Sequence, residues 1–296
     1  MCTNPSIGYF KDDCFIYIGS LKGRKEQEFS HDYVLVPCGQ CLECRLHRAS
    51  EWALRCCHEL KSHDKGIFLT LTYNDDNLPP NGTLVKKHVQ DFIKRLRRHI
   101  DYYGDCTKIR YLCAGEYGDL SLRPHYHLLV FGYYPSDPRL LHGLQKIGKN
   151  SLFTSPTLTK LWGKGHISFG AITFESARYT CQYALKKQTG EHSHYYVDRG
   201  VIPEFMICSN RNGLGYDFAV SHDNMFERGY LTMNGKKIGI PRYYQKICER
   251  EIPDYYASFK EMRRMSAPKV YEPMRLAARD EKLHKRVSMH RHSLEC

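Results

Sequence analysis

Two histidines stand two residues apart at the start of an apolar run, in the sequence PHYHLLVFG. Alternate side chains of a strand point to the same face, so His125 and His127 can reach one ion while Tyr126 points into packing. We expect Glu116, at the end of the preceding strand, to supply a third ligand, with Asp119 as the alternative. Two imidazoles and a carboxylate can hold a divalent cation and leave room for phosphate oxygens. The competing interpretation is a pair of surface or half-buried histidines.

A second group lies in the sequence ARYTCQYALKK, which has helical spacing. Tyr179, Tyr183 and Lys187 are four residues apart, so they share one face of a helix. A tyrosine hydroxyl becomes a nucleophile when its phenolate is favoured or when a metal makes phosphorus a better electrophile. Lys187 would offer positive charge to the transferred phosphate. The alternative is an ordinary amphipathic helix that packs one tyrosine and exposes the other.

A third group is a cluster of cysteines in the sequence CGQCLEC, formed by Cys38, Cys41 and Cys44. A structural zinc ion needs four ligands in a tetrahedron, so one more ligand is required. We expect Cys2 to be the fourth ligand, with Cys14 and His47 as alternatives. Such a site would fasten the N-terminus to the first helix. The competing interpretation is reduced, buried thiols at the start of a helix.

The chain of 296 residues carries 44 Lys and Arg against 32 Asp and Glu, a net charge of +12. This excess favours nucleic acid as the partner. A hydrophobic share of 42% excludes wholesale disorder, and no apolar run is long enough to cross a bilayer. The N-terminus lacks a secretory pattern, so we expect the cysteines to be thiols or metal ligands in a reducing compartment. No Gly-rich phosphate loop precedes a Lys-Ser or Lys-Thr pair, which argues against an ATP-driven helicase part.

These residues need regular elements to position them. Apolar, β-rich runs predict strands at 66–73, 109–118, 125–132 and 166–173. Helical spacing predicts one helix after Thr83, which can cap it, and another at 175–190. The pattern indicates an α+β fold, with a central antiparallel sheet of about five strands covered on one face by helices.

We expect three parts along the chain. Residues 1–62 would form an N-terminal segment with the cysteine cluster and a helix packed on the core, and residues 63–220 would form the core itself. Residues 221–296 would form a basic C-terminal extension.

Taken in order, three segments resemble the three motifs of rolling-circle replication initiators of the HUH endonuclease superfamily: FLTLTY, RPHYHLLVFG and ARYTCQYALKK. The paired tyrosines resemble the two-tyrosine branch found in isometric single-stranded DNA phages. VPCGQCLECR, ahead of the first motif, is similar to the replication initiation proteins of gokushoviruses within the Microviridae. PEFMICSNRNGLG, after the tyrosine helix, also fits that group. The matched motifs cover well over half of the chain.

The resemblance implies an HUH, RRM-like core and a metal-dependent endonuclease that nicks and rejoins single-stranded DNA at a phage origin through a 5′-phosphotyrosine. It implies Mg²⁺ or Mn²⁺ at the histidine site, work in the host bacterial cytoplasm, and a host helicase and polymerase as partners, with no membrane. The DNA-binding residues would include Lys186, Arg178 and Arg123. The alternatives are a non-catalytic, zinc-stapled DNA-binding protein and a single-strand transposase on the same scaffold. A relaxase is disfavoured, because relaxases usually place their tyrosines before the histidine motif.

Overall fold

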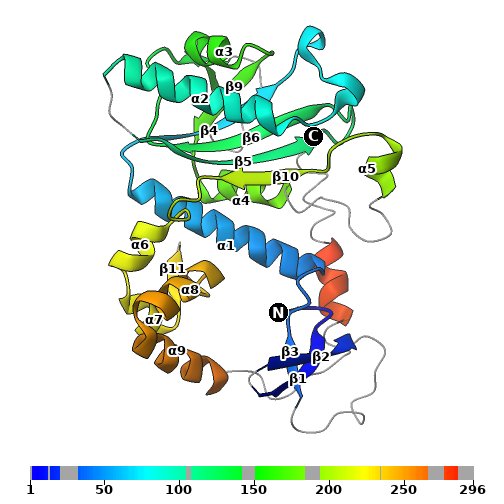
Figure 1. Cartoon of the computed structure of the whole chain (residues 1–296), viewed down its shortest axis with the longest axis vertical. Coiled ribbons are helices and arrows are strands. Elements are labelled where there is room, and N and C mark those ends of the chain that lie inside the picture. The colour runs from blue at the N-terminus through cyan, green and yellow to red at the C-terminus, as the bar shows by residue number, and fades with distance from the viewer. Residues whose placement is uncertain are drawn as a thin grey trace. The chain divides into compact units, whose positions relative to one another are not determined.

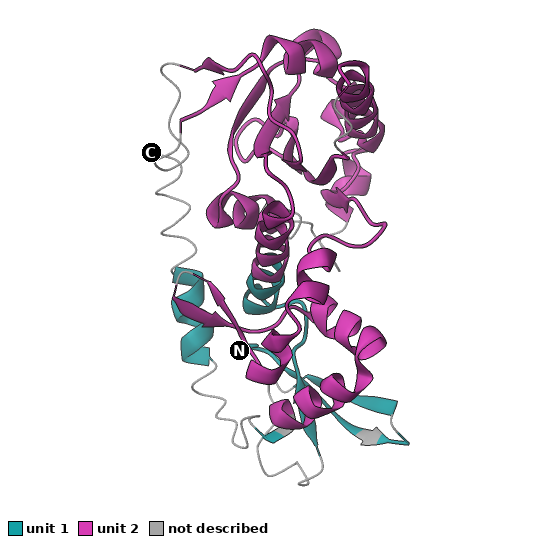
Figure 2. Cartoon of the chain, turned by 90° about the vertical axis from the view of Figure 1, so that its left-hand side faces the viewer, with its two compact units in different colours: residues 1–49, 264–296 teal, residues 50–263 magenta. Residues whose placement is uncertain are grey.

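A computed structural model describes residues 2–12, 14–20, 33–104, 108–141, 151–183, 194–233, 235–265 and 277–285. It divides the chain into two compact units (Figure 2). One unit comprises residues 1–49 with 264–296, and the other comprises residues 50–263. The predicted division at residues 62 and 220 stays a prediction. Among the described residues, none of the helices is both long and apolar enough to span a membrane.

The larger unit contains a seven-stranded antiparallel sheet (Figure 1). Its strands, in spatial order, are β10 (Phe205–Cys208), β5 (Arg110–Tyr117), β6 (Pro124–Phe131), β4 (Gly66–Thr72), β9 (Ile167–Ala171), β8 (Phe153–Thr154) and β7 (Arg139–Leu140). The predicted α+β class and antiparallel sheet are confirmed. The sheet is wider than expected because three short strands extend its edges, and β7 and β8 have only two residues each.

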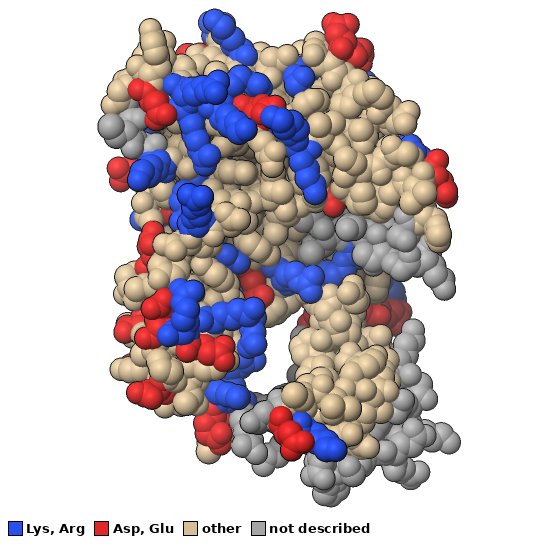
Figure 3. All heavy atoms as spheres, in the orientation of Figure 1, with Lys and Arg blue, Asp and Glu red and all other residues tan. Residues whose placement is uncertain are grey.

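One face of this sheet is covered by α2 (Lys86–Tyr102) and α3 (Pro156–Trp162). The apolar residues of α2 recur at helical spacing and pack on alternate residues of β4 and β6, which form the main core. The solvent side of α2 is basic, and Figure 3 shows the Lys and Arg side chains that gather over it. The exposed cations are Lys86, Lys87, Lys94, Arg97 and Arg98.

Two expectations about this region were wrong. Thr83 does not cap α2: the N-cap residue is Val85, and the Thr83 hydroxyl instead accepts the backbone N–H of Ile202 at 2.9 Å. Helices also lie on both faces of the sheet, because α4 (Phe174–Tyr183) packs against β5 and β6 from the side opposite α2 (Figure 1). The physical reason is that β6 is apolar on both faces, as its unbroken run of four buried residues, 128–131, indicates.

The larger unit has a second hydrophobic cluster beside the sheet. It is formed by α6 (Tyr216–Ser221), α7 (Asn224–Arg228), α8 (Arg242–Glu251), α9 (Pro253–Met265) and the hairpin β11 (Leu231–Met233) and β12 (Lys236–Ile238), with Leu54 from α1 (Leu42–Lys61). A short helix, α5 (His194–Asp198), precedes β10. The α1 segment therefore links the sheet with the helical cluster, since its residue Glu59 pairs with Arg110 of β5 at 3.2 Å.

The smaller unit is built on a three-stranded antiparallel sheet in the order β2 (Cys14–Ser20), β1 (Ser6–Lys11), β3 (Val34–Val36). It also contains the first turns of α1 and a helical segment at residues 277–285. Arg279 of that segment pairs with Glu43 of α1 at 2.6 Å. This unit carries the cysteine cluster described below.

Candidate metal centre and active site

The sheet brings Glu116 of β5 together with His125 and His127 of β6. Glu116 lies directly opposite His125 in the antiparallel register, and His127 follows two residues later on the same face. The Nε2 atoms of His125 and His127 lie 2.6 Å and 2.9 Å from the same oxygen, Oε1 of Glu116. The three side chains thus converge on one point, as the spacing of the histidines predicts.

The other nitrogen of each imidazole is held by the protein. Nδ1 of His125 lies 3.2 Å from the backbone oxygen of Arg123, and Nδ1 of His127 lies 3.0 Å from the hydroxyl of Thr70. Partners of this kind fix the orientation of metal-binding histidines, because they leave Nε2 to face the metal. The phenyl ring of Phe68 also stacks on His127, with ring centroids 5.5 Å apart.

The environment of Glu116 fits a cation. Burial by itself raises the pKa of its carboxyl, but the hydrogen bonds with the two histidines outweigh burial and hold the pKa below its usual value. The second oxygen, Oε2, is buried and has no hydrogen-bond partner among the described residues. An unsatisfied buried carboxylate oxygen costs free energy, which a bound cation would recover.

The three side chains offer their ligand atoms within 4.8 Å of one another. Imidazole nitrogens with a carboxylate oxygen suit divalent ions such as Mn²⁺, and a cation here would take the place of the protons that now bridge the imidazoles to Glu116. Asp119, the alternative third ligand, lies exposed in the turn between β5 and β6 and is outside this group. The assignment of Glu116, His125 and His127 as metal ligands stays a prediction.

Tyr179 of α4 lies next to the histidines. Its ring meets that of His127 edge-on, with centroids 5.3 Å apart, and that of Phe68 at 6.5 Å. Tyr183 is the last residue of α4, one turn further on, but its side chain lies outside the described part of the chain, as do Lys186 and Lys187. Arg178, on the same helix, is exposed. One predicted nucleophile is therefore placed beside the candidate metal centre.

Comparisons with known proteins identify the family of the chain. Residues 66–188, which contain the three motifs, match the family model of replication-associated protein ORF2. The chain is 33% identical over 232 residues to replication-associated protein VP4 of Bdellovibrio phage phiMH2K, covering 75% of this chain and 70% of the relative. It is also 33% identical over 230 residues to replication-associated protein ORF2 of Spiroplasma virus 4, with the same coverage. The chain belongs to the replication-associated proteins of Microviridae-type phages.

A third relative of this phage replication-associated protein extends the comparison. Replication-associated protein ORF4 of Chlamydia phage 1 is 31% identical over 229 residues, which cover 74% of this chain and 55% of the relative. No solved structure is significantly similar to the chain. The resemblance to Microviridae replication initiators is confirmed.

Arg123 of the replication-associated protein stands just before the histidine strand. Its guanidinium pairs with Asp75 at 2.8 Å and donates to the backbone oxygen of Tyr73 at 3.2 Å. These contacts hold a partly exposed cation next to His125, while its own backbone oxygen orients that histidine. The position is compatible with the predicted DNA contact, which stays a prediction.

Tyr126 points to the opposite face, as expected for the residue between the histidines. It is fully buried, and its hydroxyl lies 2.8 Å from that of Tyr73 and accepts the backbone N–H of Val85 at 2.8 Å. The same hydroxyl donates to the backbone oxygen of Val85 at 3.2 Å, and Tyr73 is linked in turn to His88 at 2.7 Å. Tyr126 therefore anchors the histidine strand to the start of α2.

The smaller unit brings together the four predicted cysteines, Cys2, Cys38, Cys41 and Cys44. Their sulfur atoms all lie within 4.8 Å of one another, and Cys2 Sγ is 3.5 Å from Cys38 Sγ and 3.7 Å from Cys41 Sγ. Sulfurs bound to one tetrahedral zinc at ~2.3 Å would be separated by about 3.8 Å, so this geometry is compatible with zinc. Cys14 and His47 are exposed and lie outside the group.

Thr70 is the one residue at this site that the sequence did not single out. It lies opposite His127 in the register of β4 and β6. A signal was present, because Thr70 and Thr72 alternate with apolar residues in FLTLTY and so mark one face of that strand as polar. What the sequence lacked was the pairing of β4 with β6, which selects His127 as the partner of Thr70.

Proposed function

We propose that this protein initiates rolling-circle replication of a circular, single-stranded phage genome by nicking and rejoining the origin strand through a tyrosine ester. The membership of the chain among phage replication-associated proteins supports the role in replication. The observation that carries the chemistry is the convergence of Glu116, His125 and His127 at the ring of Tyr179.

Glu116, His125 and His127 would hold Mg²⁺ or Mn²⁺. When bound, such an ion draws electron density from the scissile phosphate and makes phosphorus a better electrophile. The protein's own contribution is to orient the ligands, which Thr70 and the backbone of Arg123 do from behind the histidines. Phe68 and Tyr179 border His127 with aromatic rings, which limits the access of water to that side.

The reaction is a transesterification. The tyrosine oxygen forms a bond to phosphorus, the bond from phosphorus to the 3′-oxygen breaks, and the phenolic proton is transferred in net to the 3′-oxygen. The products are a 5′-phosphotyrosine and a free 3′-hydroxyl that a host polymerase can extend. The ester preserves the bond energy, so rejoining needs no ATP. Lys187 would place positive charge near the transferred phosphate.

Two tyrosines explain how one protein can complete a replication cycle. Tyr179 and Tyr183 lie one turn apart on α4, a rise of about 6 Å. While one tyrosine holds the 5′ end of the displaced strand, the other can cut the regenerated origin. The released 3′-hydroxyl then attacks the first ester, which closes a circle and leaves the protein joined through the second tyrosine.

The remaining parts of the proposal concern binding. Arg123, Arg178 and Lys186 would contact phosphates of single-stranded origin DNA. The four-cysteine group would bind a structural zinc ion that fastens the N-terminus to α1. The protein would work in the cytoplasm of the host bacterium with the host's helicase and polymerase.

The experiment is covalent trapping. The full chain is incubated with labelled single-stranded fragments of the phage genome and Mn²⁺, and adducts are resolved on a denaturing gel. We expect an adduct that EDTA prevents, that His127→Ala abolishes and that Tyr183→Phe impairs. Tyr102→Phe is the matched control, because Tyr102 is exposed on α2, on the far side of the sheet.

The absence of any tyrosine-dependent adduct with every genome fragment would refute the enzymatic proposal. DNA binding that persists in EDTA, together with no effect of Tyr183→Phe, would instead support a passive, zinc-stapled DNA-binding protein. A transposase would also form the adduct, but single-tyrosine transposases would not need both Tyr179 and Tyr183.

A further inference from the structure

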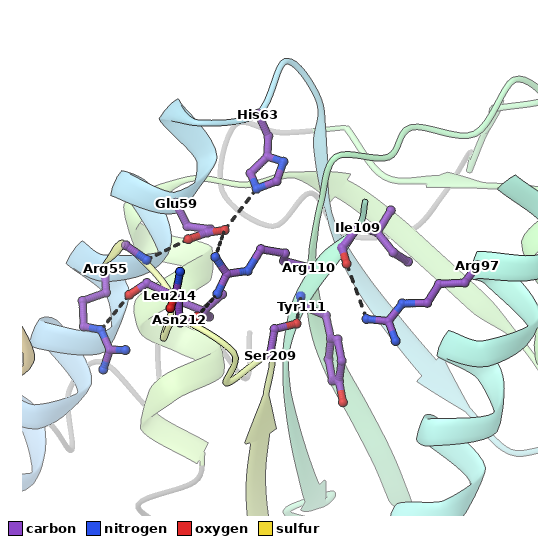
Figure 4. Close-up of polar contacts among 11 residues, drawn as sticks. Arg55, Glu59, His63, Arg97, Ile109, Arg110, Tyr111, Ser209, Asn212 and Leu214 are labelled. Atoms are coloured by element: carbon purple, nitrogen blue, oxygen red, sulfur yellow. Dashed lines mark hydrogen bonds and ion pairs between the residues drawn. The ribbon is translucent and has the colours of Figure 1, made fainter. Parts of the chain in front are cut away.

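The loop at residues 209–215, with the sequence SNRNGLG, is held in place from several directions (Figure 4). At its start, the backbone N–H of Ser209 donates to the backbone oxygen of Tyr111 at 2.9 Å, and the Tyr111 N–H donates to the Ser209 hydroxyl at 3.1 Å. At its centre, the guanidinium of Arg110 donates to the backbone oxygen of Asn212. The proposed nicking chemistry gives this loop no part.

The end of the loop is fixed by buried charged residues of α1. Arg55 donates from Nε to the backbone oxygen of Leu214 at 3.0 Å, and Glu59 accepts the backbone N–H of Gly215 at 2.7 Å. Glu59 also pairs with Arg110 at 3.2 Å, so one buried carboxylate joins α1, β5 and the loop. Burying such groups is costly unless they are fully paired, and here their partners are largely backbone atoms of the loop.

Arg55 is also clamped between aromatic rings. Its guanidinium carbon lies 4.0 Å from the ring centroids of both Trp52 and Tyr243. The loop closes tightly over the same region: a Cβ added at Gly213 would lie 2.7 Å from Tyr243, and one at Gly215 would lie 2.3 Å from the Tyr244 hydroxyl. The shape of the loop is therefore determined by its surroundings, and it has little freedom to relax.

The tip of this rigid loop is polar and unused by the fold. Asn210, Arg211 and Asn212 are exposed, and their side chains form no hydrogen bond or ion pair with any described residue. Asn212 adopts a left-handed backbone conformation with φ of 50°, which directs the tip outward at some local cost. Unpaired donors and acceptors on a rigid loop are suited to recognition rather than to stability.

The tip lies at a definite distance from the candidate active site. Along the edge strand β10, Phe205 pairs with Gly115, next to Glu116, and Ser209 meets Tyr111 at the other end. Five residues of β5 therefore separate Glu116 from the start of the loop, a distance of about 17 Å. At about 3.4 Å per stacked nucleotide, this corresponds to about five nucleotides of a single strand.

We propose that Asn210, Arg211 and Asn212 read bases of the origin strand several nucleotides from the cleaved phosphate and so contribute to the choice of origin sequence. Arginine and asparagine are the side chains that form paired hydrogen bonds with guanine and adenine, respectively. The proposal rests on the proposed function for its substrate, single-stranded origin DNA. Recognition by the tip requires no metal and no tyrosine.

The test is a selection from a random-sequence single-stranded DNA library, carried out in EDTA so that no strand is cut. The wild-type protein and the Arg211→Ala and Asn212→Gly variants are compared. Asn212→Gly removes the amide but retains a residue that tolerates positive φ. We expect the wild type to enrich a sequence motif and each variant to lose preference at a subset of its positions. The affinity of Arg211→Ala for the wild-type motif should fall about 10-fold more than its affinity for the unselected pool.

Arg228→Ala serves as the control, because it removes an equally exposed arginine elsewhere in the same unit. It should lower both affinities alike and leave the motif unchanged. The proposal is overturned if Arg211→Ala acts like this control, if it has no effect, or if the wild type enriches no motif. The covalent trapping experiment is independent, since a protein that forms no adduct can still show or lack this base preference.

Discussion

Removal of a single hydroxyl separates the two sides of the histidine strand. Tyr126 lies between His125 and His127, so a motif-based view would count it with the catalytic residues. The structure places its side chain on the α2 face, where it contacts Tyr73 and Val85 and not the candidate metal centre. We therefore expect Tyr126→Phe to lower stability while it leaves nicking intact.

The size of the effect follows from the contacts that are lost. The hydroxyl of Tyr126 makes three hydrogen bonds, and a typical net contribution is about 1 kcal/mol each. Tyr73 keeps its bond to His88, and Val85 is only half-buried, so water can replace part of the loss. Filling the same space with phenylalanine leaves no cavity larger than an oxygen atom. The expected decrease in the free energy of unfolding is about 2 kcal/mol.

The measurement is urea denaturation of the wild type and of Tyr126→Phe, with adduct formation measured at a temperature where both are folded. Tyr179→Phe is the matched variant, because it makes the same chemical change on the other face of the sheet. It should impair adduct formation and retain the ring contacts with His127 and Phe68. A folded Tyr126→Phe protein that fails to nick, or one with unchanged stability, would refute the division of roles between the two faces.

Three further predictions concern other parts of the molecule. Thr70→Val removes the hydroxyl behind His127, so we expect the Mn²⁺ concentration for half-maximal adduct formation to rise about 10- to 100-fold; an unchanged requirement would contradict the ligand role of His127. Burial lowers the pKa of His58 to about 3 from 6.5, so the unfolded chain takes up the proton first and stability falls as the pH drops below about 6.5. Between about pH 7 and pH 5 the wild type should therefore lose about 2 kcal/mol more than His58→Gln in urea denaturation; equal losses would show that His58 is not buried in its neutral form. Cys2→Ser should remove the zinc that purified protein contains, whereas Cys14→Ser should retain it, as measured by mass spectrometry of the metal; zinc in both would exclude Cys2 as a ligand.

The local pattern of the sequence was enough to place the central strands and the histidine group. Strand spacing put His125 and His127 on one face, and the short connection after Glu116 made antiparallel pairing with the histidine strand the simplest arrangement. The structure brings these three side chains together. Likewise, the choice of Cys2 over Cys14 followed from the need for one more sulfur, and the fold of the smaller unit brings Cys2 to the cluster.

Features that depend on distant pairing could not be predicted. The buried contacts of Glu59 with Gly215 and of Arg55 with Leu214 join residues more than 150 positions apart, and no periodicity within either segment indicates them. The two-residue strands β7 and β8 are too short to give an alternating pattern. The positions of α2 and α4 on opposite faces also depend on the pairing order of strands, which one sequence does not reveal.

The direction of the histidines is set by polar contacts rather than by hydrophobic alternation. Residues 128–131 are all buried, so this part of β6 would fit the core equally well if it were turned by one residue. Such a shift would move Tyr126 away from its hydrogen bonds at α2 and would bury His125 and His127 in an apolar core without Glu116. The cost of leaving several buried polar groups unpaired makes the observed register the stable one. The bulky residue between the histidines therefore acts as the element that keeps both of them on the face where DNA would be cut.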